Sequence, residues 1–318
     1  MTSMSTPQRP IDSGFGERST ADDVLDGIDL SGKLAIVTGG YSGLGLETVR
    51  SLARAGARVI VPARRPDTAR DALAGIDGAE VARLDLADLA DVHAFARGVL
   101  DSGRDVDLLI NNAGVMACPE TRVGPGWEAQ FAVNHLGHHA LTNLLWPALA
   151  RAGARVVAVS SGAHWRSGIR WDDPQFTRGY DKWLAYGQAK TANALFALHL
   201  DTLGQSHGVR AFSLNPGPIL TPLQRHLPRA EMVDAGWIDE EGNGIDPTFK
   251  TPEQGAATQV WAATSPRLAG HGGVYCQDCD IAPADGVAAH ARDPEQAARL
   301  WALSAELTGL DAFATPGR

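Results

Sequence analysis

The sequence predicts an α/β protein built on a doubly wound parallel sheet with helices on both faces. Short runs of β-branched residues alternate with stretches at helical spacing from Lys33 onward, and the first run leads into a glycine-rich turn. Strands that alternate with helices form βαβ units, whose strands lie parallel in a sheet that is covered on both sides. The 318 residues, 44% of them hydrophobic, are enough to bury one sizeable core.

Six strands and five helices are predicted in order along the chain. The strands cover residues 34–38, 57–63, 79–84, 106–110, 154–160 and 209–214. The helices cover residues 44–55, 67–74, 88–101, 126–150 and 184–206. We therefore expect one domain over residues 31–318. It is preceded by an N-terminal tail, residues 1–30, in which "STADD" at 19–23 is typical of the start of a short helix.

The composition argues against several classes of partner. The net charge is −9 and no run of five basic residues occurs, so nucleic acid and anionic membrane surfaces are poor candidates. No apolar run approaches the roughly 18 residues of a membrane span, and the N-terminus lacks the apolar centre of a signal peptide. Three cysteines are too few for a disulfide framework. These features predict a cytoplasmic protein that acts on a small molecule.

The first predicted strand runs into "TGGYSGLG", residues 38–45, and then into a helix. Glycines let the backbone approach a pyrophosphate, and a helix N-terminus offers free N–H groups and the positive end of a dipole. The alternative is a tight turn that binds nothing. The strand before the turn and the helix after it favour a dinucleotide site, formed here by Gly39, Tyr41, Ser42, Gly43, Leu44 and Gly45.

Two arginines, Arg64 and Arg65, end the second predicted strand in "VPARRP". At this position a dinucleotide fold reads the adenosine ribose, with an acid for a free 2′-hydroxyl or an arginine for a 2′-phosphate. Arginine binds phosphate through paired charge-assisted hydrogen bonds, so the sequence favours NADP over NAD, with a solvated surface pair as the alternative. After the third strand, Asp85, followed by Leu86, either meets the adenine or caps the next helix.

Tyr186 and Lys190, in "YGQAK", lie four residues apart in a predicted helix, so their side chains point the same way. A surface pair is the alternative interpretation. Lowering the pKa of a tyrosine from about 10 to about 7 takes roughly 4 kcal/mol. A cation about 4 Å away supplies about that much at an effective dielectric near 20. The spacing therefore predicts a proton donor tuned by its own lysine.

Six motifs in order make the chain similar to the short-chain dehydrogenase/reductase family over about residues 31–225. They are "TGGYSGLG", "NNAG" at 111–114, Asn134 in "VNHLGH", "VSS" at 159–161, "YGQAK", and "NPGPILT" at 215–221. The opening "IDLSGKLAIVTGG", the "SSGAH" segment and the long gap before the tyrosine resemble the retinol-dehydrogenase-like branch. The resemblance implies a single Rossmann domain and an NAD(P)-dependent oxidoreductase that interconverts a carbonyl and an alcohol.

The resemblance also implies roles for individual residues. The catalytic set would be Asn134, Ser161, Tyr186 and Lys190. The cofactor would further contact Asn112, Ala113, Gly114, Pro216, Gly217, Ile219 and Thr221, together with Tyr186 and Lys190. Ser161 would hydrogen-bond the substrate oxygen, and Asn134 would order a water near Lys190. Ser161 and Tyr186 are 25 residues apart, farther than in most of the family, so the choice between Ser160 and Ser161 stays open.

Residues 162–183 and 222–250 break the alternation of strands and helices, and long loops in compact domains are often functional. Both follow strands at the end where ligands of such sheets bind. They carry Trp165, Trp171, Phe176, Trp183, Trp237 and Phe249. We expect a lid over a bulky, mainly apolar substrate, with 222–250 as its main part. The alternative is that the aromatics pack the loops onto the body or into a contact of a homo-oligomer.

No metal site is predicted. "HLGHH" at 135–139 offers no carboxylate, and "CQDC" at 276–279 lacks two further zinc ligands, because the only other cysteine is Cys118. We interpret the "CQDC" pair as packed cysteines. Two other functions remain open on the same fold. One is a nucleotide-sensing regulator, which typically lacks part of the serine–tyrosine–lysine set. The other is a dehydratase or epimerase, which would leave no net oxidation of the cofactor.

Overall fold

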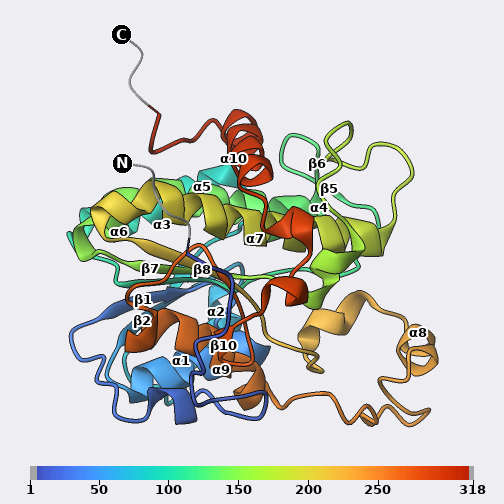
Figure 1. Ribbon diagram of the computed structural model, residues 1–318, viewed down its shortest axis with the longest axis horizontal. Coiled ribbons are helices and arrows are strands. Elements are labelled where there is room, and N and C mark those ends of the chain that lie inside the picture. Colours follow the sequence, from blue (N-terminus) through green and yellow to red (C-terminus); the bar gives the residue numbers. More distant parts are fainter. Residues whose placement is uncertain (1–5, 315–318) are drawn as a thin grey trace.

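A computed structural model describes residues 6–314, and these residues form an eight-stranded sheet in the order β10-β9-β8-β7-β4-β1-β2-β3 (Figure 1). The strands are β1 (Leu34–Val37), β2 (Arg58–Ala63), β3 (Ala79–Arg83), β4 (Leu108–Asn111), β7 (Arg155–Val159), β8 (Arg210–Asn215), β9 (Tyr275–Gln277) and β10 (Asp280–Ile281). Neighbouring strands pair in parallel except β9 and β10. The predicted doubly wound fold is confirmed.

Helices cover both faces of this sheet, as Figure 1 shows. The α-helices are α1 (Gly43–Arg54), α2 (Pro66–Ala72), α3 (Leu89–Asp101), α4 (Ala129–Phe131), α5 (Gly137–Leu144), α6 (Trp146–Ala152), α7 (Lys182–Gly204), α8 (Arg229–Asp234), α9 (Pro252–Thr264) and α10 (Pro294–Thr308). One core lies between the sheet and α1 with α9. The other lies between the sheet and α3, α5, α6 and α7.

The order of the strands sets where a ligand can enter. The chain runs from β1 outward to β2 and β3, and then returns to place β4 on the other side of β1. The two loops that leave the carboxyl ends of β1 and β4 therefore diverge and open a crevice at this switch point. The glycine-rich turn follows β1, and "NAG" at 112–114 follows β4.

All six strands predicted from the sequence are present, but the predicted helix over 126–150 is interrupted. The chain there forms α4, then a single π-helical turn at Ala132–Leu136, then α5 and α6. A π turn adds a residue to the helical repeat, which re-aims the side chains within it. A short hairpin of β5 (Arg122–Val123) and β6 (Trp127–Glu128) precedes α4, and the strands β9 and β10 are also additional.

Residues 6–30, which we call the N-terminal strap, belong to the part of the chain predicted as a tail. The expected short helix is a 3-10 helix at Asp23–Leu25, and Val24 and Leu25 are buried in the core beneath α9. The Gln8 side chain donates to the carbonyls of Tyr275 and Ala282, both at 2.7 Å. The strap thus runs along the β9–β10 edge instead of leaving the domain. Residues 1–5 of the predicted tail and 315–318 of the predicted domain lie outside the described residues.

Candidate active site

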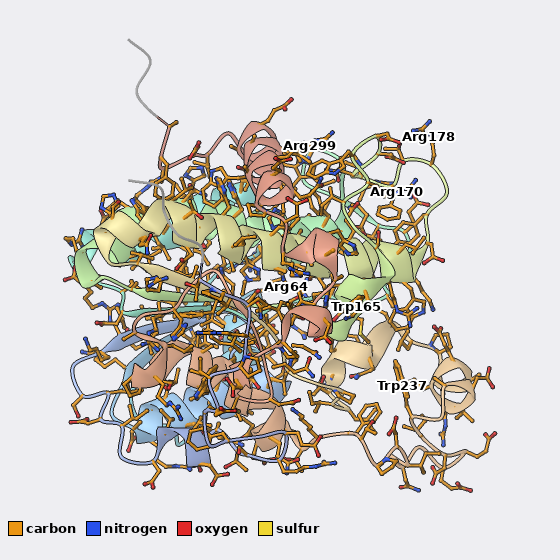
Figure 2. The ribbon with its side chains drawn as sticks, in the orientation of Figure 1. Arg64, Trp165, Arg170, Arg178, Trp237 and Arg299 are labelled. Carbon is orange, nitrogen blue, oxygen red and sulfur yellow. The ribbon has the colours of Figure 1, made fainter. Side chains whose placement is uncertain are left out.

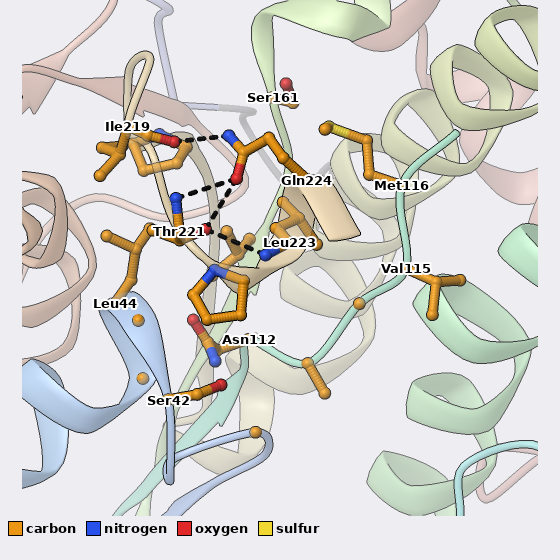
Figure 3. Close-up of a pocket in the computed structure, with 18 of the residues that line it drawn as sticks. Ser42, Leu44, Asn112, Val115, Met116, Ser161, Ile219, Thr221, Leu223 and Gln224 are labelled. Atoms are coloured by element: carbon orange, nitrogen blue, oxygen red, sulfur yellow. Dashed lines mark hydrogen bonds between the residues drawn. The ribbon is translucent and has the colours of Figure 1, made fainter. Parts of the chain in front are cut away.

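A cavity of about 710 Å³ opens at the carboxyl ends of β1, β4, β7 and β8. Figure 3 shows it between the turn at Ser42 and Leu44, the strand end at Asn112, and the segment from Ile219 to Gln224. Every residue that the sequence assigns to the cofactor lines this cavity, and so does Ser161. One continuous space therefore joins the glycine-rich turn to Tyr186.

The glycine-rich turn has the shape of a phosphate cradle. Gly43 adopts φ +51°, a left-handed conformation that other residues rarely take. At Gly45 a Cβ atom would lie 2.3 Å from the Gly39 carbonyl oxygen, so no side chain fits there. The turn ends at the N-terminus of α1, where no side chain caps the first free N–H groups. These groups remain available to an anion, and the cradle fits the diphosphate of a nicotinamide dinucleotide.

Thr38, which the sequence interpretation missed, ties the ends of β1 and β4 together. Its Oγ1 accepts the backbone N–H groups of Asn112 and Ala113, both at 2.9 Å. The Asn112 side chain returns a bond of 2.8 Å to the Thr38 carbonyl. Thr38 is the first residue of "TGGYSGLG". Its hydroxyl at the end of the first strand was the only feature of the sequence that could have indicated this role. These bonds fix the floor of the crevice.

Asn134 lies in the π-helical turn and does not line the cavity. Its side-chain oxygen accepts from the Val115 N–H at 2.8 Å, and its side-chain nitrogen donates to the Val115 carbonyl at 2.9 Å. Asn134 therefore clamps the backbone of a residue that does line the cavity. Its own carbonyl accepts from Nδ1 of His138 at 2.9 Å.

Tyr186, Lys190 and Ser161 meet at one end of the cavity. Asp181 caps the start of α7 through the N–H groups of Trp183 and Leu184, and both Tyr186 and Lys190 are buried on this helix. Lys190 Nζ lies 5.5 Å from the centre of the Tyr186 ring and donates to the Val159 carbonyl at 2.9 Å. The Ser161 side chain lies beside Tyr186, close enough to lower the pKa of its hydroxyl. This arrangement can exchange a proton with a group bound between the two.

The structure distinguishes the two serines at the end of β7. Ser160 donates its hydroxyl hydrogen to the Lys190 carbonyl at 2.7 Å and is buried. Ser161 lines the cavity beside Tyr186, and its hydroxyl accepts from the Ala163 N–H at 3.2 Å. Ser160 thus holds β7 against α7, whereas Ser161 is the serine beside the tyrosine. Residues 167–182, which lie between Ser161 and Tyr186 in the sequence, do not line the cavity, and this arrangement accommodates the long spacing.

The protonation states differ from the sequence expectation. Burial raises the pKa of Tyr186 to about 12, against the opposing effect of the Ser161 side chain. Burial also lowers the pKa of Lys190 to about 8. The expected value near 7 for Tyr186 assumed a fully charged lysine without any loss of hydration, and burial acts on both groups. In the chain alone, Tyr186 is therefore held in its protonated form.

Arg64 and Arg65 are exposed at the end of β2 and line the other end of the cavity with Asp85 and Leu86. The helix cap that Asp85 could have provided belongs to Asp88, whose side chain accepts from the Ala90 N–H. The Asp85 carboxylate instead accepts from the Ala87 N–H at 3.0 Å. Asp85 thus stays at the cavity wall.

The aromatic residues of the two irregular segments divide into two groups. Trp183, Trp237 and Phe249 line the cavity. Trp165, Trp171 and Phe176 do not: Trp165 is exposed, Trp171 donates to Gln296 on α10 at 2.7 Å, and Phe176 is fully buried. In Figure 2, Arg170 and Arg178 lie in the upper part of the view, as α10 does, whereas Trp237 lies in the lower part near α8. Residues 162–183 therefore pack mainly onto the body.

The histidines and cysteines of the candidate metal motifs have protein partners. His135 bonds to Ser304 at 2.7 Å, and His138 bonds to Thr38 at 2.9 Å. Cys276 and Cys279 are buried in the core beside α9, and burial raises the pKa of both thiols. Among residues 6–314, no group of three or more His, Cys, Asp or Glu side chains could hold a metal ion.

In the same range, no helix is long and apolar enough to cross a membrane.

Comparisons with known proteins agree with this architecture. A sequence model of the short chain dehydrogenase family matches residues 33–232. A probable oxidoreductase of Streptomyces lividans is 47% identical over 88% of this chain and 98% of its own length. Retinol dehydrogenase 12 of Mus musculus is 37% identical over 89% of this chain and 88% of its own length. Polyprenol dehydrogenase of Mus musculus is 39% identical over 87% of this chain and 84% of its own length.

Solved structures give the same result. A crystal structure of a Mycobacterium paratuberculosis protein has a TM-score of 0.73 at 34% identity, covering 93% of this chain and all of that one. The Pseudomonas aeruginosa RhlG/NADP complex has a TM-score of 0.61 at 26% identity, covering 81% and 98%. A Brucella melitensis 3-ketoacyl-(acyl-carrier-protein) reductase in complex with NADH has a TM-score of 0.61 at 25% identity, covering 78% and 97%. With its motifs, its fold and these relatives in agreement, the chain belongs to the short-chain dehydrogenase/reductase family, in the retinol-dehydrogenase-like branch.

Proposed function

We propose that this protein is an NADP-dependent oxidoreductase of the cytoplasm that interconverts a carbonyl and an alcohol on a bulky, mainly apolar substrate. The observation that supports it best is the continuity of the cavity from the glycine cradle to Tyr186. A cofactor held in the cradle at one end would reach the tyrosine at the other. Such a dinucleotide supplies or accepts a hydride when it is bound.

The residues of this chain would hold the cofactor along the whole cavity. The turn at 39–45 would take the diphosphate, and Arg64 with Arg65 would take a 2′-phosphate. Asn112, Ala113 and Gly114 would line the ribose and adenosine side. Pro216, Gly217, Ile219 and Thr221 would face the nicotinamide.

The proton chemistry would belong to Tyr186. Its raised pKa keeps the phenol protonated, so it can donate to the oxygen of a carbonyl that is being reduced, and the phenolate can recover a proton in the reverse direction. Ser161 would hydrogen-bond the same oxygen and stabilise the negative charge that develops on it. Lys190, 5.5 Å from the ring, would stabilise the phenolate that remains after proton transfer.

An apolar compartment beside Tyr186 supports the substrate class. Tyr186 packs in one cluster with a set of apolar side chains from three parts of the chain: Met116, Ala117, Ala163, Trp183, Leu223, Leu227, Met232 and Trp237. Ligand sites are mostly apolar with a few polar groups that fix orientation. The polar groups beside this compartment include Ser161, Tyr186 and Arg166, which lies 5.2 Å from the centre of the Trp183 ring, so a carbonyl on a large apolar skeleton fits better than a sugar.

This proposal is tested with a panel of carbonyl compounds, each of which is assayed with NADPH and with NADH. The absorbance of the reduced nicotinamide reports net oxidation, which a dehydratase or epimerase would not produce. We expect turnover of long-chain or polycyclic aldehydes and ketones with NADPH preferred. Cofactor binding without turnover of any compound would favour the sensing role, and a preference for NADH would contradict the assignment of Arg64 and Arg65.

A further inference from the structure

Three arginines line the cavity at the end where the adenosine phosphate of a cofactor is expected, and they come from two separate segments of the chain. Arg64 and Arg65 follow β2, and Arg225 comes from the 3-10 helix Pro222–His226, on the opposite wall. Figure 3 shows this second wall at Thr221, Leu223 and Gln224, across from Ser42 and Leu44. Arginines from two distant parts of the sequence thus line the same cavity as the glycine-rich turn.

None of these three arginines forms a salt bridge with any residue in the range 6–314, although the chain as a whole carries a net charge of −9. Two carboxylates line the same cavity, and both are engaged elsewhere. Asp85 accepts from Ala87, and Asp246 accepts from the N–H and hydroxyl of Thr248. Within residues 6–314, the three guanidinium groups at this end of the cavity are therefore not paired with a carboxylate, and each is available to an anion.

Arg225 lies close enough to Arg64 for the two charges to act on each other. Partial burial lowers the pKa of Arg225 most, and the charge of Arg64 lowers it further. The neighbouring His226 has its pKa lowered by partial burial, then by Arg225, and also by Arg64. Like charges that face one another repel, and an anion bound between them relieves that repulsion.

The wall that carries Arg225 is held in place before any ligand binds. The Gln224 side chain accepts from the Thr221 N–H at 2.9 Å and donates to the Ile219 carbonyl at 2.7 Å. Thr221 packs directly against the glycine turn, since a Cβ added at Gly43 would lie 3.3 Å from the Thr221 Cβ. The backbone at Arg225, next to Gln224, is therefore held relative to the cradle, and the Arg225 guanidinium donates to the Pro222 carbonyl at 3.1 Å. A fixed donor loses less entropy when it binds a phosphate.

We propose that Arg225 binds the 2′-phosphate of the cofactor together with Arg64 and Arg65, so that the segment over the substrate compartment also selects NADP over NAD. This inference rests on the proposed function. An adenosine 2′-phosphate is the part of the cofactor expected beside Arg64, whereas the diphosphate is expected at the glycine turn. Beyond Arg225 the same segment contributes Leu227 and Trp237 to the apolar cluster around Tyr186. Phosphate bound at Arg225 would hence also restrain the wall that meets the substrate.

Binding titrations with four nucleotides test the inference without relying on activity. The protein, followed by its tryptophan fluorescence, is titrated with NADPH, NADH, 2′,5′-ADP and 5′-AMP. Loss of a charge-assisted bond in Arg225→Ala should weaken NADPH and 2′,5′-ADP by about tenfold or more, and change NADH and 5′-AMP by less than about twofold. Arg225→Lys should recover part of the loss, because lysine keeps the charge without the planar fork.

Arg229→Ala is the matched control. Arg229 lies on the same segment and its removal changes the net charge equally, but it bonds to the Glu240 carbonyl and does not line the cavity. It should leave all four affinities unchanged. Equal losses in Arg225→Ala and Arg229→Ala would mean that only the segment had been disturbed, which would overturn the inference.

The outcomes separate this inference from the proposed cofactor. If Arg64→Ala weakens NADPH and Arg225→Ala does not, NADP specificity stands and the role of Arg225 is refuted. If Arg225→Ala weakens NADPH and NADH equally, Arg225 faces the shared diphosphate and the inference is wrong. If the native protein binds NADH more tightly than NADPH, the proposed cofactor fails and this inference fails with it.

A measurement on the native chain covers the case in which Arg225 variants do not fold. Trypsin cleaves after Arg225 and after Arg229, and the fragments are distinguished by mass. At equal saturation, 2′,5′-ADP should slow cleavage after Arg225 more than 5′-AMP does, while cleavage after Arg229 is the reference within the same digest. Equal protection of Arg225 by the two nucleotides would count against a contact with the 2′-phosphate.

Discussion

Tyr186 and Lys190 each lose hydration in the same buried site, and the effects on their protonation differ. Burial favours the neutral form of any ionisable group, which raises the pKa of a phenol and lowers that of an ammonium. The pair thus has a stable arrangement with a protonated tyrosine and a lysine that is easily neutralised. A site in this state is prepared to give a proton rather than to take one.

Replacing Tyr186 by Phe removes the proton donor and leaves the cavity shape almost unchanged. We expect kcat to fall by about 10² or more, as is typical for the loss of a general acid. Affinity for NADPH, measured by fluorescence titration, should stay close to that of the native protein. A variant that keeps most of its turnover would show that another group supplies the proton.

Lys190→Met should stabilise the fold at pH 7 while it removes activity. Holding a buried charge with a pKa of about 8, against an ordinary 10.5, costs about 3 kcal/mol. Because the unfolded chain binds more protons between these two pH values, the free energy of unfolding of the native protein should rise with pH from about 8 to 10.5. The variant should lack this rise. Urea unfolding at pH 7 and pH 10 measures both effects, and parallel pH profiles would contradict the assignment to Lys190.

At the residue scale, all the residues that the sequence assigned to the cofactor line one cavity, because a glycine turn and an arginine pair act through position along the chain. It could not predict Thr38 or Arg225. The hydroxyl of Thr38 matters only because β4 lies beside β1, and Arg225 matters only because its helix faces β2 across the cavity. The pKa of Tyr186 also depended on burial, which spacing alone does not reveal.

At the scale of elements, the 3-10 helix Gly162–Arg166 anchors the end of β7 at Ser161. The Ser161 carbonyl accepts from His164 Nδ1 at 2.7 Å and from the Tyr275 hydroxyl at 3.2 Å. The other ring nitrogen of His164 accepts from the Ala288 N–H at 3.2 Å. A neutral ring with its hydrogen on Nδ1 satisfies both bonds, and burial lowers the pKa of His164, which favours that form.

Two amide substitutions at His164 test this anchor. In His164→Asn the side-chain amide replaces Nδ1 and can still donate to Ser161, whereas in His164→Gln it replaces Nε2 and cannot. We expect Asn to keep most of kcat and Gln to lose about tenfold to a hundredfold, as a displaced catalytic group would. NADPH affinity should not change in either variant. Equal kcat values in two folded variants would exclude the anchoring role.

The segment 226–246 is the other element with a separable role. Glu231 pairs with Lys182 and accepts from the Trp183 indole at 2.8 Å, so α8 fastens this segment to the start of α7. Replacing 226–246 with a short Gly/Ser linker keeps Arg225 and removes the apolar wall at Leu227 and Trp237. KM for large apolar carbonyls should rise sharply while NADPH binding survives. Loss of both together, or a change only in oligomeric state, would indicate a structural role.

The elements that the sequence missed are short or irregular. β9 and β10 have three and two residues, too few for a visible alternation, and the turn between them places Asp278 and Cys279 at positive φ. The π turn at Ala132–Leu136 interrupts a pattern that otherwise fits one long helix. In each case tertiary contacts, which act between distant segments, decide the local structure.

At the scale of the whole molecule, the N-terminal strap completes the edge of the sheet. The Gln8 amide donates two bonds and accepts a third from the Tyr275 N–H at 2.9 Å, as a neighbouring strand would. The N–H groups of Ile11 and Ser13 bond to the Asp280 carboxylate. The polar composition of this segment predicted a tail, but its polar groups form hydrogen bonds with β9, with Asp280 of β10 and with Ala282.

Gln8→Ala should therefore lower the stability of the whole domain. Losing three partly buried hydrogen bonds should reduce the free energy of unfolding by about 1 to 3 kcal/mol. Thermal unfolding followed by circular dichroism gives the comparison. Arg9→Ala is the control, since Arg9 is exposed and its side chain forms no hydrogen bond or salt bridge within residues 6–314. Equal melting temperatures for the two variants would show that the strap contributes nothing.

Tyr275, to which Gln8 bonds, is 267 residues away along the chain, so this contact cannot form until most of the protein has been synthesised. At about 5 to 20 residues per second, a ribosome takes roughly 13 to 53 seconds to synthesise the intervening chain. β8 ends at Asn215 and β9 begins at Tyr275, so while the residues between them are synthesised the β8 edge has no neighbour, and an unpaired strand edge is where chains associate wrongly. The yield of folded protein should thus depend on how fast residues 216–277, up to the end of β9, are translated.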